Sequence, residues 1–206
     1  MKENFHASSR INSGEPCQWP RPARRHFFQG CQLGCTGCWN QASHAFQGTE
    51  FTVENVAGKV LQAHVDHSVE GVTFSGGEPM QQADSELALI QGLLSRGQKL
   101  TFGMFSGYTE RELDEGRYSI WNRQMVLEEK QSLWKAIRAE LDFAILGRFN
   151  QALPGSAPLR SSRNQVLRFF SGRYTEADFG EQLVEVHIED SGRAAMTGFP
   201  ILGPLW

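Results

Sequence analysis

The chain has 206 residues, of which 40% are hydrophobic and 21% charged, the composition of a globular protein large enough for one substantial core. Its formal net charge of −3 and pI of about 6.1 give no support for a nucleic-acid-binding surface. No apolar run approaches the roughly 18 residues that a membrane span requires, and Met1–Ser13 is too polar to be a signal peptide. We therefore expect a cytoplasmic protein, in which cysteines stay reduced and act as metal ligands or catalysts before they form disulfides.

Residues 1–24 are rich in proline and predict an irregular N-terminal extension, followed by a single domain over residues 25–206. Through most of that domain strands alternate with helices, and each strand ends in a glycine-containing turn. This alternation is typical of βαβ units around a parallel sheet. The first predicted elements are a short strand at His26–Phe28, a helix over Thr52–Val65 capped by Thr52, and a strand at Gly71–Phe74. A second helix follows, which has Leu87, Ile90, Leu93 and Leu94 on one stripe and stops at Gly97. After it come a strand over Lys99–Phe105, a short helix that begins with a Thr109/Glu112 capping box, a longer helix within Trp121–Glu140 and a strand over Leu141–Leu146.

The end of the chain has a different pattern. Two short strand-like segments, Gln182–Ile188 and Arg193–Thr197, flank Glu189–Gly192 and predict a closing β-hairpin. The fold class is therefore α/β with mostly parallel strands and a C-terminal hairpin. In parallel α/β folds chemistry is located at the carboxyl ends of the strands, where the glycine-rich turns of this chain are expected.

The most informative segment is a loop with three cysteines. Cys31, Cys35 and Cys38 follow the spacing C-x3-C-x2-C, so three thiolates from eight consecutive residues can converge on one metal centre. A [4Fe–4S] cluster held by three cysteines leaves one iron open for chemistry, whereas a structural zinc site needs four ligands. Interleaved glycines let the backbone curl and expose amide N–H groups to cluster sulfides: Gly30, Gly34 and Gly37.

Zinc is the alternative metal. Cys17 lies fourteen residues before Cys31, and His44 lies six residues after Cys38, so either side chain could supply a fourth ligand. Zinc sites, however, pair cysteines in two short knuckles or with paired histidines. We therefore interpret Cys17 as an incidental thiol and His44 as a residue of the loop.

Several segments together resemble the radical S-adenosylmethionine (SAM) superfamily. The cysteine loop resembles that of activating enzymes of anaerobic ribonucleotide reductase, with Thr36–Asn40 in the place of a recurring Gly-Cys-x-Gly-Cys-x-Asn sequence. Ser75–Pro79 is similar to the superfamily turn that meets the SAM amino group. Later segments resemble the same subgroup: Ser106–Thr109 is similar to T-G-Y-T, Asp142–Phe149 to D-x-x-x-x-G-R-F and Leu159–Gln165 to L-R-G-S-x-N-Q.

The resemblance implies an incomplete TIM-like βα barrel, a cluster on the three cysteines, and SAM as second cofactor. Glu78 suits the SAM ammonium, and Ser106 or Tyr108 suits its ribose or adenine. Arg148 suits a carboxylate, with a strand-end salt bridge as the alternative; Asn164 and Gln165 are possible partners of sugar hydroxyls. The implied cofactor-binding residues are Gly37, Trp39, Asn40, Gly76, Gly77, Glu78, Pro79, Ser106, Tyr108 and Arg148.

The chain departs from the family pattern in three places. Asn12–Pro16 replaces an N-G-P-G turn, Gly37 stands where many members have an aromatic residue, and Ser161-Ser162 replaces a Gly-Ser pair. These departures weaken the transfer of N-terminal substrate contacts and of a close backbone approach near Ser161.

By this resemblance, one electron from the reduced cluster cleaves the C5′–S bond of SAM and the resulting 5′-deoxyadenosyl radical abstracts a hydrogen atom. No catalytic residue is required beyond the cluster and SAM. The carboxylates that follow Thr109 are interpreted as a solvated helix face. The electron donor would be of the flavodoxin or ferredoxin type.

Three functions remain open from the sequence. The first is a glycyl-radical activase that acts on an anaerobic ribonucleotide reductase. The second is a radical SAM enzyme of the same subgroup that modifies another peptide or a small molecule, such as a deazapurine precursor. The third is a non-catalytic zinc- or cluster-binding interaction module.

Overall fold

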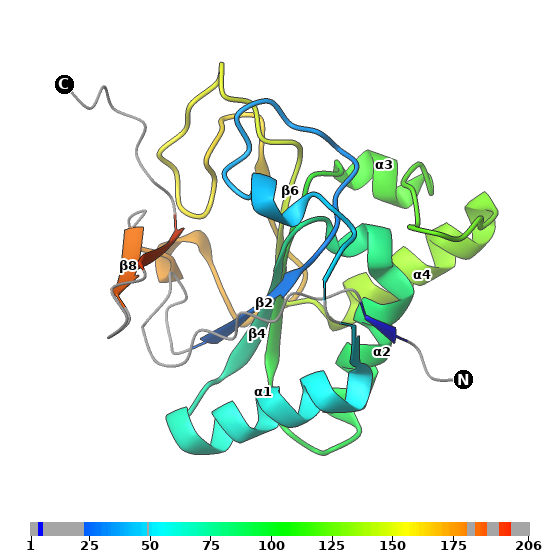
Figure 1. The fold of residues 1–206 in the computed structure, drawn as a ribbon, viewed down its shortest axis with the longest axis vertical. Helices are drawn as coiled ribbons and strands as arrows, with labels where there is room; N and C mark the ends of the chain where they lie inside the picture. The colour runs from blue at the N-terminus through cyan, green and yellow to red at the C-terminus, as the bar shows by residue number, and fades with distance from the viewer. Residues whose placement is uncertain (1–3, 6–22, 49, 181–183, 189–193, 199–206) are drawn as a thin grey trace.

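The computed structural model describes residues 4–5, 23–48, 50–180, 184–188 and 194–198. Figure 1 shows a central sheet with helices packed beside it. None of the helices in the described ranges has both the length and the apolar composition of a membrane span. The elements are β1 (Asn4–Phe5), β2 (Ala23–Phe28), η1 (Gln41–Ser43), β3 (Phe51–Thr52), α1 (Val53–His67), β4 (Gly71–Gly76), η2 (Pro79–Gln82), α2 (Ala83–Leu94), β5 (Thr101–Ser106), α3 (Glu110–Asp114), α4 (Leu127–Glu140), β6 (Phe143–Leu146), β7 (Val166–Phe169), η3 (Glu176–Asp178), β8 (Val184–Ile188) and β9 (Ala194–Gly198).

The main sheet has five strands in the order β2-β4-β5-β6-β7. The first four strands are parallel, and β7 pairs antiparallel with β6. This confirms the predicted α/β class with mostly parallel strands. The strand pairing does not establish barrel closure, so the partial barrel stays a prediction.

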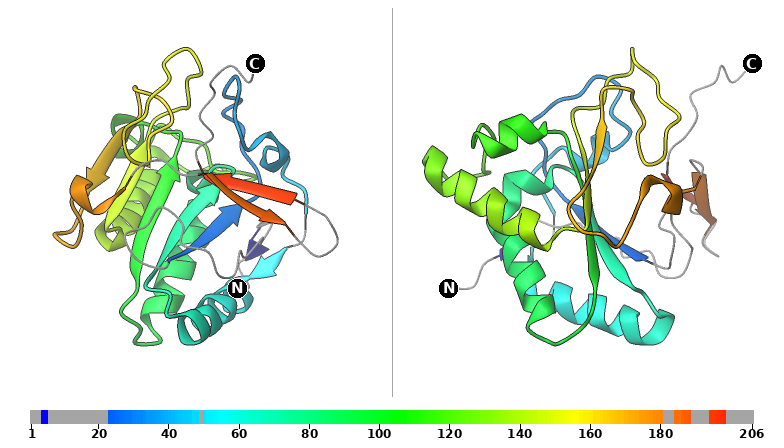
Figure 2. Two further views of the ribbon diagram at one scale, coloured as in Figure 1. Left: turned by 90° about the vertical axis from the view of Figure 1, so that its left-hand side faces the viewer. Right: turned by 180° about the vertical axis from the view of Figure 1, so that it is seen from behind.

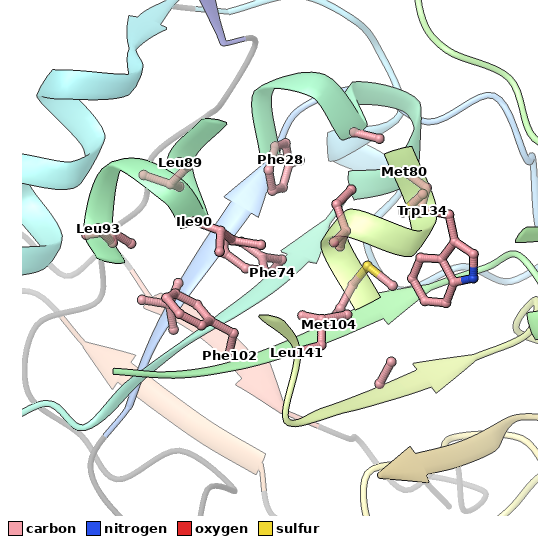
Figure 3. Packing of buried hydrophobic residues seen from close by; sticks show 14 of the residues in the cluster. Phe28, Phe74, Met80, Leu89, Ile90, Leu93, Phe102, Met104, Trp134 and Leu141 are labelled. Atoms are coloured by element: carbon pink, nitrogen blue, oxygen red, sulfur yellow. The ribbon is translucent and has the colours of Figure 1, made fainter. Parts of the chain in front are cut away.

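Helices α1, α2 and α4 lie on one side of the sheet (Figure 2) because alternate strand residues face them. Phe74 of β4, Phe102 and Met104 of β5 and Trp134 of α4 are all buried in this core, as Figure 3 shows. The opposite strand face packs against a second, smaller cluster: Phe143, Ile145, Leu159, Tyr174 and Phe179. Strand β6 is therefore buried on both faces, which explains its continuous apolar sequence.

Local sequence signals are accurate at several element ends. The Thr52 side chain caps α1 by accepting from the Asn55 N–H at 3.3 Å. The predicted capping box of Thr109 and Glu112 is present at the start of α3. Gly97 ends the turn after α2 with a left-handed φ of 73°, a conformation that favours glycine.

Other sequence predictions need correction. Within the N-terminal segment, which is expected to be irregular and extended, Asn4–Phe5 forms a two-residue strand that pairs antiparallel with Phe51–Thr52. The sequence places Leu94 on one stripe with Leu93, but Leu94 is 37% exposed whereas Leu93 is fully buried. Strand β7 has no counterpart among the predicted elements. Its side chains alternate only between exposed and partly buried positions, and the strand is held by its pairing with β6.

The predicted C-terminal hairpin is confirmed as a strand pair. β8 and β9 pair antiparallel, with Val186 opposite Met196. The connecting residues 189–193 and the predicted strand start at Gln182 lie outside the described residues.

Candidate functional site

The cysteine loop begins where β2 ends. Cys31, Cys35 and Cys38 are free thiols with partly exposed side chains. The Cys38 N–H donates to the Cys35 carbonyl at 3.1 Å, which closes a tight turn between these two cysteines. The interleaved glycines have left-handed φ angles, as expected for a backbone that curls around a ligand: Gly30, Gly34 and Gly37 at 114°, 61° and 73°.

The returning part of the loop anchors its start. The Gly30 N–H donates to the Ser43 carbonyl at 2.7 Å, and the Cys31 N–H donates to the His44 carbonyl at 2.9 Å. The buried Gln29 side chain donates to the carbonyls of Ala42 and Ala45. His44 thus supports the loop through its backbone.

The electrostatics of the thiols follow from their burial. Burial raises the pKa of Cys31 to about 11, and it also raises the pKa of Cys35. The N–H groups of Leu33 and Phe149 act in the opposite direction by hydrogen-bonding the sulfurs of Cys31 and Cys35 respectively. A metal centre that binds these cysteines must therefore displace the thiol protons.

The donor set fits an iron–sulfur cluster. No three or more His, Cys, Asp or Glu side chains in the described part of the chain are grouped to hold a single metal ion. A four-iron cluster binds each cysteine through a different iron, so its ligands are spread more widely than those of one ion. Three mutually interacting thiols on one curved loop, with backbone N–H groups directed at two of the sulfurs, match that chemistry. Cys17 lies outside the described residues.

The Gly-Gly-Glu-Pro turn at the end of β4 lies directly against the cysteine loop. Gly77 N–H donates to the Phe28 carbonyl at 2.8 Å, and Glu78 N–H donates to the Gly30 carbonyl at 2.8 Å. A Cβ atom at Gly77 would overlap the Gly30 backbone, so this approach requires glycine. The two segments that the sequence singled out are therefore one structural unit.

The Glu78 carboxylate is buried and holds the neighbouring turn of β5. It accepts hydrogen bonds from the Ser106 hydroxyl at 2.8 Å, the Gly107 N–H at 2.7 Å and the Met80 N–H at 3.0 Å. Burial raises its pKa to about 7 in spite of these donors. Its contact with a ligand ammonium stays a prediction, and the partly exposed parts of the turn are Gly76 and Gly77. Pro79 is buried and begins η2.

Gln81 of η2 joins the cysteine loop to two other segments and was not singled out in the sequence. Its side-chain oxygen accepts from the Gln32 N–H at 2.9 Å. Its side-chain nitrogen donates to the Tyr108 hydroxyl at 3.1 Å and to the Ser119 hydroxyl at 2.9 Å. Gln81 is 1% exposed, so these partners satisfy a polar group that has no access to water. The only sequence signal was a pair of glutamines at the start of a helical segment.

The network also involves the predicted ligand contacts of the β5 turn. Ser106 and Tyr108 are both buried, and the Ser106 hydroxyl accepts from the Tyr108 N–H at 3.1 Å. The Tyr108 hydroxyl bonds the Ser119 hydroxyl at 2.9 Å. The Ser106 side chain thus bonds Glu78, and the Tyr108 side chain bonds Gln81, while the contact of either residue with SAM stays a prediction.

The segment after β6 covers another side of the loop. Trp39 and Phe149 pack with ring centroids 5.4 Å apart. A Cβ atom at Gly37 would overlap the Gln151 side chain, so glycine makes room for this segment. Asn40, also a predicted cofactor contact, is exposed and precedes η1.

Arg148 forms the salt bridge that the sequence left as an alternative. Its Nη1 donates to both carboxylate oxygens of Glu112 at 2.9 Å, and the guanidinium lies 5.4 Å from the Tyr108 ring centroid. Asn164 donates to the Arg148 carbonyl at 2.7 Å, and Gln165 donates to the Gly147 carbonyl at 3.2 Å. The last two side chains therefore fasten their loop to the end of β6.

These contacts bring four strand-end segments together at the carboxyl edge of the parallel strands. Two comparisons with known proteins indicate the family of the chain. A model of the 4Fe–4S single cluster domain family matches residues 23–168. Pyruvate formate-lyase-activating enzyme from Clostridium pasteurianum is 43% identical over 72 residues, which are 32% of this chain and 29% of that enzyme. The match thus spans less than a third of the relative's length.

The family match begins at the first residue of β2 and extends into β7, so it includes the three cysteines and all four strand-end segments. The chain belongs to the 4Fe–4S single cluster domain family.

Proposed function

We propose that this chain is a radical SAM enzyme that activates a glycyl radical enzyme. The observation that carries the proposal is the direct contact between the cysteine loop and the Gly-Gly-Glu turn, through the Glu78 N–H and the Gly30 carbonyl at 2.8 Å. A ligand that binds the open iron of a cluster on the three thiols would also reach this turn. Residues 25–206 would form one radical SAM domain in the cytoplasm, and an incomplete barrel would leave room for a protein loop.

Each part of the site would have a separate role. Cys31, Cys35 and Cys38 would hold the [4Fe–4S] cluster, which supplies one electron for cleavage of the SAM C5′–S bond. The turn at Gly76-Gly77 would present backbone groups to the amino group of SAM. Glu78 would keep the β5 turn in place beside it. The remaining cofactor-contact assignments are Gly37, Trp39, Asn40, Pro79, Ser106, Tyr108 and Arg148.

The substrate class is inferred from the relative, whose name describes an activating enzyme of pyruvate formate-lyase. The S-G-Y-T, G-R-F and N-Q segments resemble the activases of anaerobic ribonucleotide reductase, which we propose as the target. A flavodoxin or ferredoxin would donate the electron.

Anaerobic reconstitution with iron and sulfide, followed by dithionite reduction and an assay for 5′-deoxyadenosine, tests the proposal. We expect a brown protein that releases 5′-deoxyadenosine. Alanine at Cys31, Cys35 or Cys38 should abolish cluster uptake and SAM cleavage, whereas Cys17→Ala should preserve both. Loss of the metal in Cys17→Ala, or a colourless zinc protein without cleavage, would refute the radical SAM assignment.

The target needs a second measurement. Incubation with an anaerobic ribonucleotide reductase should produce a glycyl radical signal in its EPR spectrum. Cleavage of SAM without that signal would point to another peptide or a small molecule as substrate.

A further inference from the structure

The segment after β6 reaches the Cys35 side of the cysteine loop. The Phe149 N–H donates to the Cys35 sulfur, and the Phe149 ring packs on Trp39. Arg148 directly precedes this residue. Its Cγ would lie 3.8 Å from a Cβ placed at Gly107, where the Leu33 side chain also converges. Arg148 is therefore built into the wall beside Cys35.

The guanidinium of Arg148 is held from two sides. Glu112 binds it through both carboxylate oxygens, and the Tyr108 ring lies beneath it. Glu112 is itself fixed, because its Oε2 accepts from the Thr109 N–H and hydroxyl, both at 2.8 Å. The positive charge thus has a defined position, although the Arg148 side chain is 42% exposed.

The cysteine loop contains no acidic side chain that would compensate the charge of Arg148. From Gln29 to Gly48 the sequence contains no Asp, Glu, Lys or Arg. The charged groups from other segments that act on Cys35 are Arg148 and Glu78. The Glu78 carboxylate is buried and accepts hydrogen bonds from the Ser106 hydroxyl and from the N–H groups of Gly107 and Met80, which compensate its charge. A guanidinium stays protonated throughout the working pH range of proteins, so Arg148 is the one of these two groups with a permanent charge.

We propose that Arg148 raises the reduction potential of the cluster by placing a fixed positive charge beside Cys35, and that Glu112 positions this charge and partly offsets it. The inference rests on the proposed function. One-electron reduction by a low-potential donor adds a negative charge to the cluster, and no protein bond forms or breaks. A nearby cation stabilises the reduced state, and a nearby anion destabilises it. Arg148 and Glu112 should therefore act in opposite directions.

A redox titration of the reconstituted protein without SAM, monitored by EPR, tests this inference. Arg148→Met should lower the equilibrium constant for reduction roughly tenfold, a fall in potential of about 59 mV for one electron. Arg148→Lys keeps the charge and should remain close to wild type. Glu112→Gln keeps an acceptor for Arg148 but removes the negative charge, so its potential should rise.

The opposite signs separate a charge effect from a loss of packing, which would shift both variants in the same direction. Unchanged potentials, or shifts of the same sign in Arg148→Met and Glu112→Gln, would overturn the inference while leaving the cluster assignment intact. If Arg148→Met fails to take up a cluster, the pair Arg148→Lys and Glu112→Gln still decides, since only the second should shift. A wild-type protein that takes up no iron would refute the proposed function and this inference together.

Discussion

Glu86 of α2 is a carboxylic acid in the apolar core. Its side chain is fully buried, and neither carboxylate oxygen has a hydrogen-bond partner among the described residues. Burial, together with the nearby Glu78 carboxylate, raises the pKa of Glu86 well above the ordinary glutamate value. The residue is therefore expected to be a neutral acid that contributes an unsatisfied polar group to the core.

We expect Glu86→Met to increase the free energy of unfolding by about 1–3 kcal/mol, because the polar group is replaced by an apolar one of similar size. The wild-type folded state holds a proton that the unfolded chain releases above the ordinary glutamate pKa. The free energy of unfolding should therefore fall as the pH rises from that value through the raised pKa, and the variant should lose part of this slope.

Urea unfolding of both proteins at about pH 5 and about pH 8 measures both effects. Glu128→Met, at an exposed position on α4, is the control and should change stability by no more than about 0.5 kcal/mol. A Glu86→Met protein that is less stable than wild type would show that the carboxyl group has a stabilising partner.

At the scale of elements, η2 connects the site. This short helix follows the Gly-Gly-Glu turn and carries two buried glutamines that point to different segments. Gln81 bonds the cysteine loop at Gln32, whereas the Gln82 side chain donates to the Gln29 carbonyl at 2.9 Å, at the end of β2. Helix η2 thus contacts the cysteine loop at Gln32 and the end of β2 at Gln29.

We expect Gln81→Leu to weaken cluster retention, because it removes the side-chain acceptor of the Gln32 N–H and one of the partners of the Tyr108 hydroxyl. Gln82→Leu is the matched control: each variant should lose about 1–3 kcal/mol of stability, but the control should keep its cluster. The measurement is the rate at which the reconstituted proteins release iron to a chelator. Equal rates for the two variants would show that Gln81 does not act on the loop specifically.

In the whole molecule, the end of the main sheet opposite the cysteine loop is held by a buried carboxylate. Asp142, the first residue of the D-x-x-x-x-G-R-F segment, lies before β6, at the end of the sheet opposite the cysteines. Its carboxylate accepts from the Phe102 N–H at 2.9 Å and from the Ser171 hydroxyl at 2.6 Å, and it is 6% exposed. These bonds join β5, β6 and the segment after β7. In parallel α/β folds such residues stabilise the fold, while residues at the other end carry the chemistry.

Asp142→Ala should therefore reduce the free energy of unfolding by about 1–3 kcal/mol, because it leaves the buried Phe102 N–H unsatisfied. Cluster content and SAM cleavage should stay at wild-type levels under conditions where the variant is folded, as monitored by circular dichroism. Loss of the cluster in a fully folded Asp142→Ala protein would contradict this separation.

The elements that depend on neighbours in the chain were predictable. The caps at Thr52 and Thr109, the stop at Gly97 and the curled cysteine loop each rest on a few consecutive residues whose chemistry suffices. Strand β7 and the β1–β3 pair were missed because short strands exist only through partners that are distant in sequence.

Three thiols on one glycine-rich loop, and a Gly-Gly-Glu turn at the end of a strand, are predictable from the amino-acid sequence because these features depend on local spacing and backbone freedom. Three contacts could be found only in the folded molecule: Gly77 leaves room for the Gly30 carbonyl, Gln81 bonds Gln32 and Arg148 pairs with Glu112. The direction of a side chain is set by its neighbours in space, and here those neighbours come from different strand ends that the parallel sheet brings to one edge.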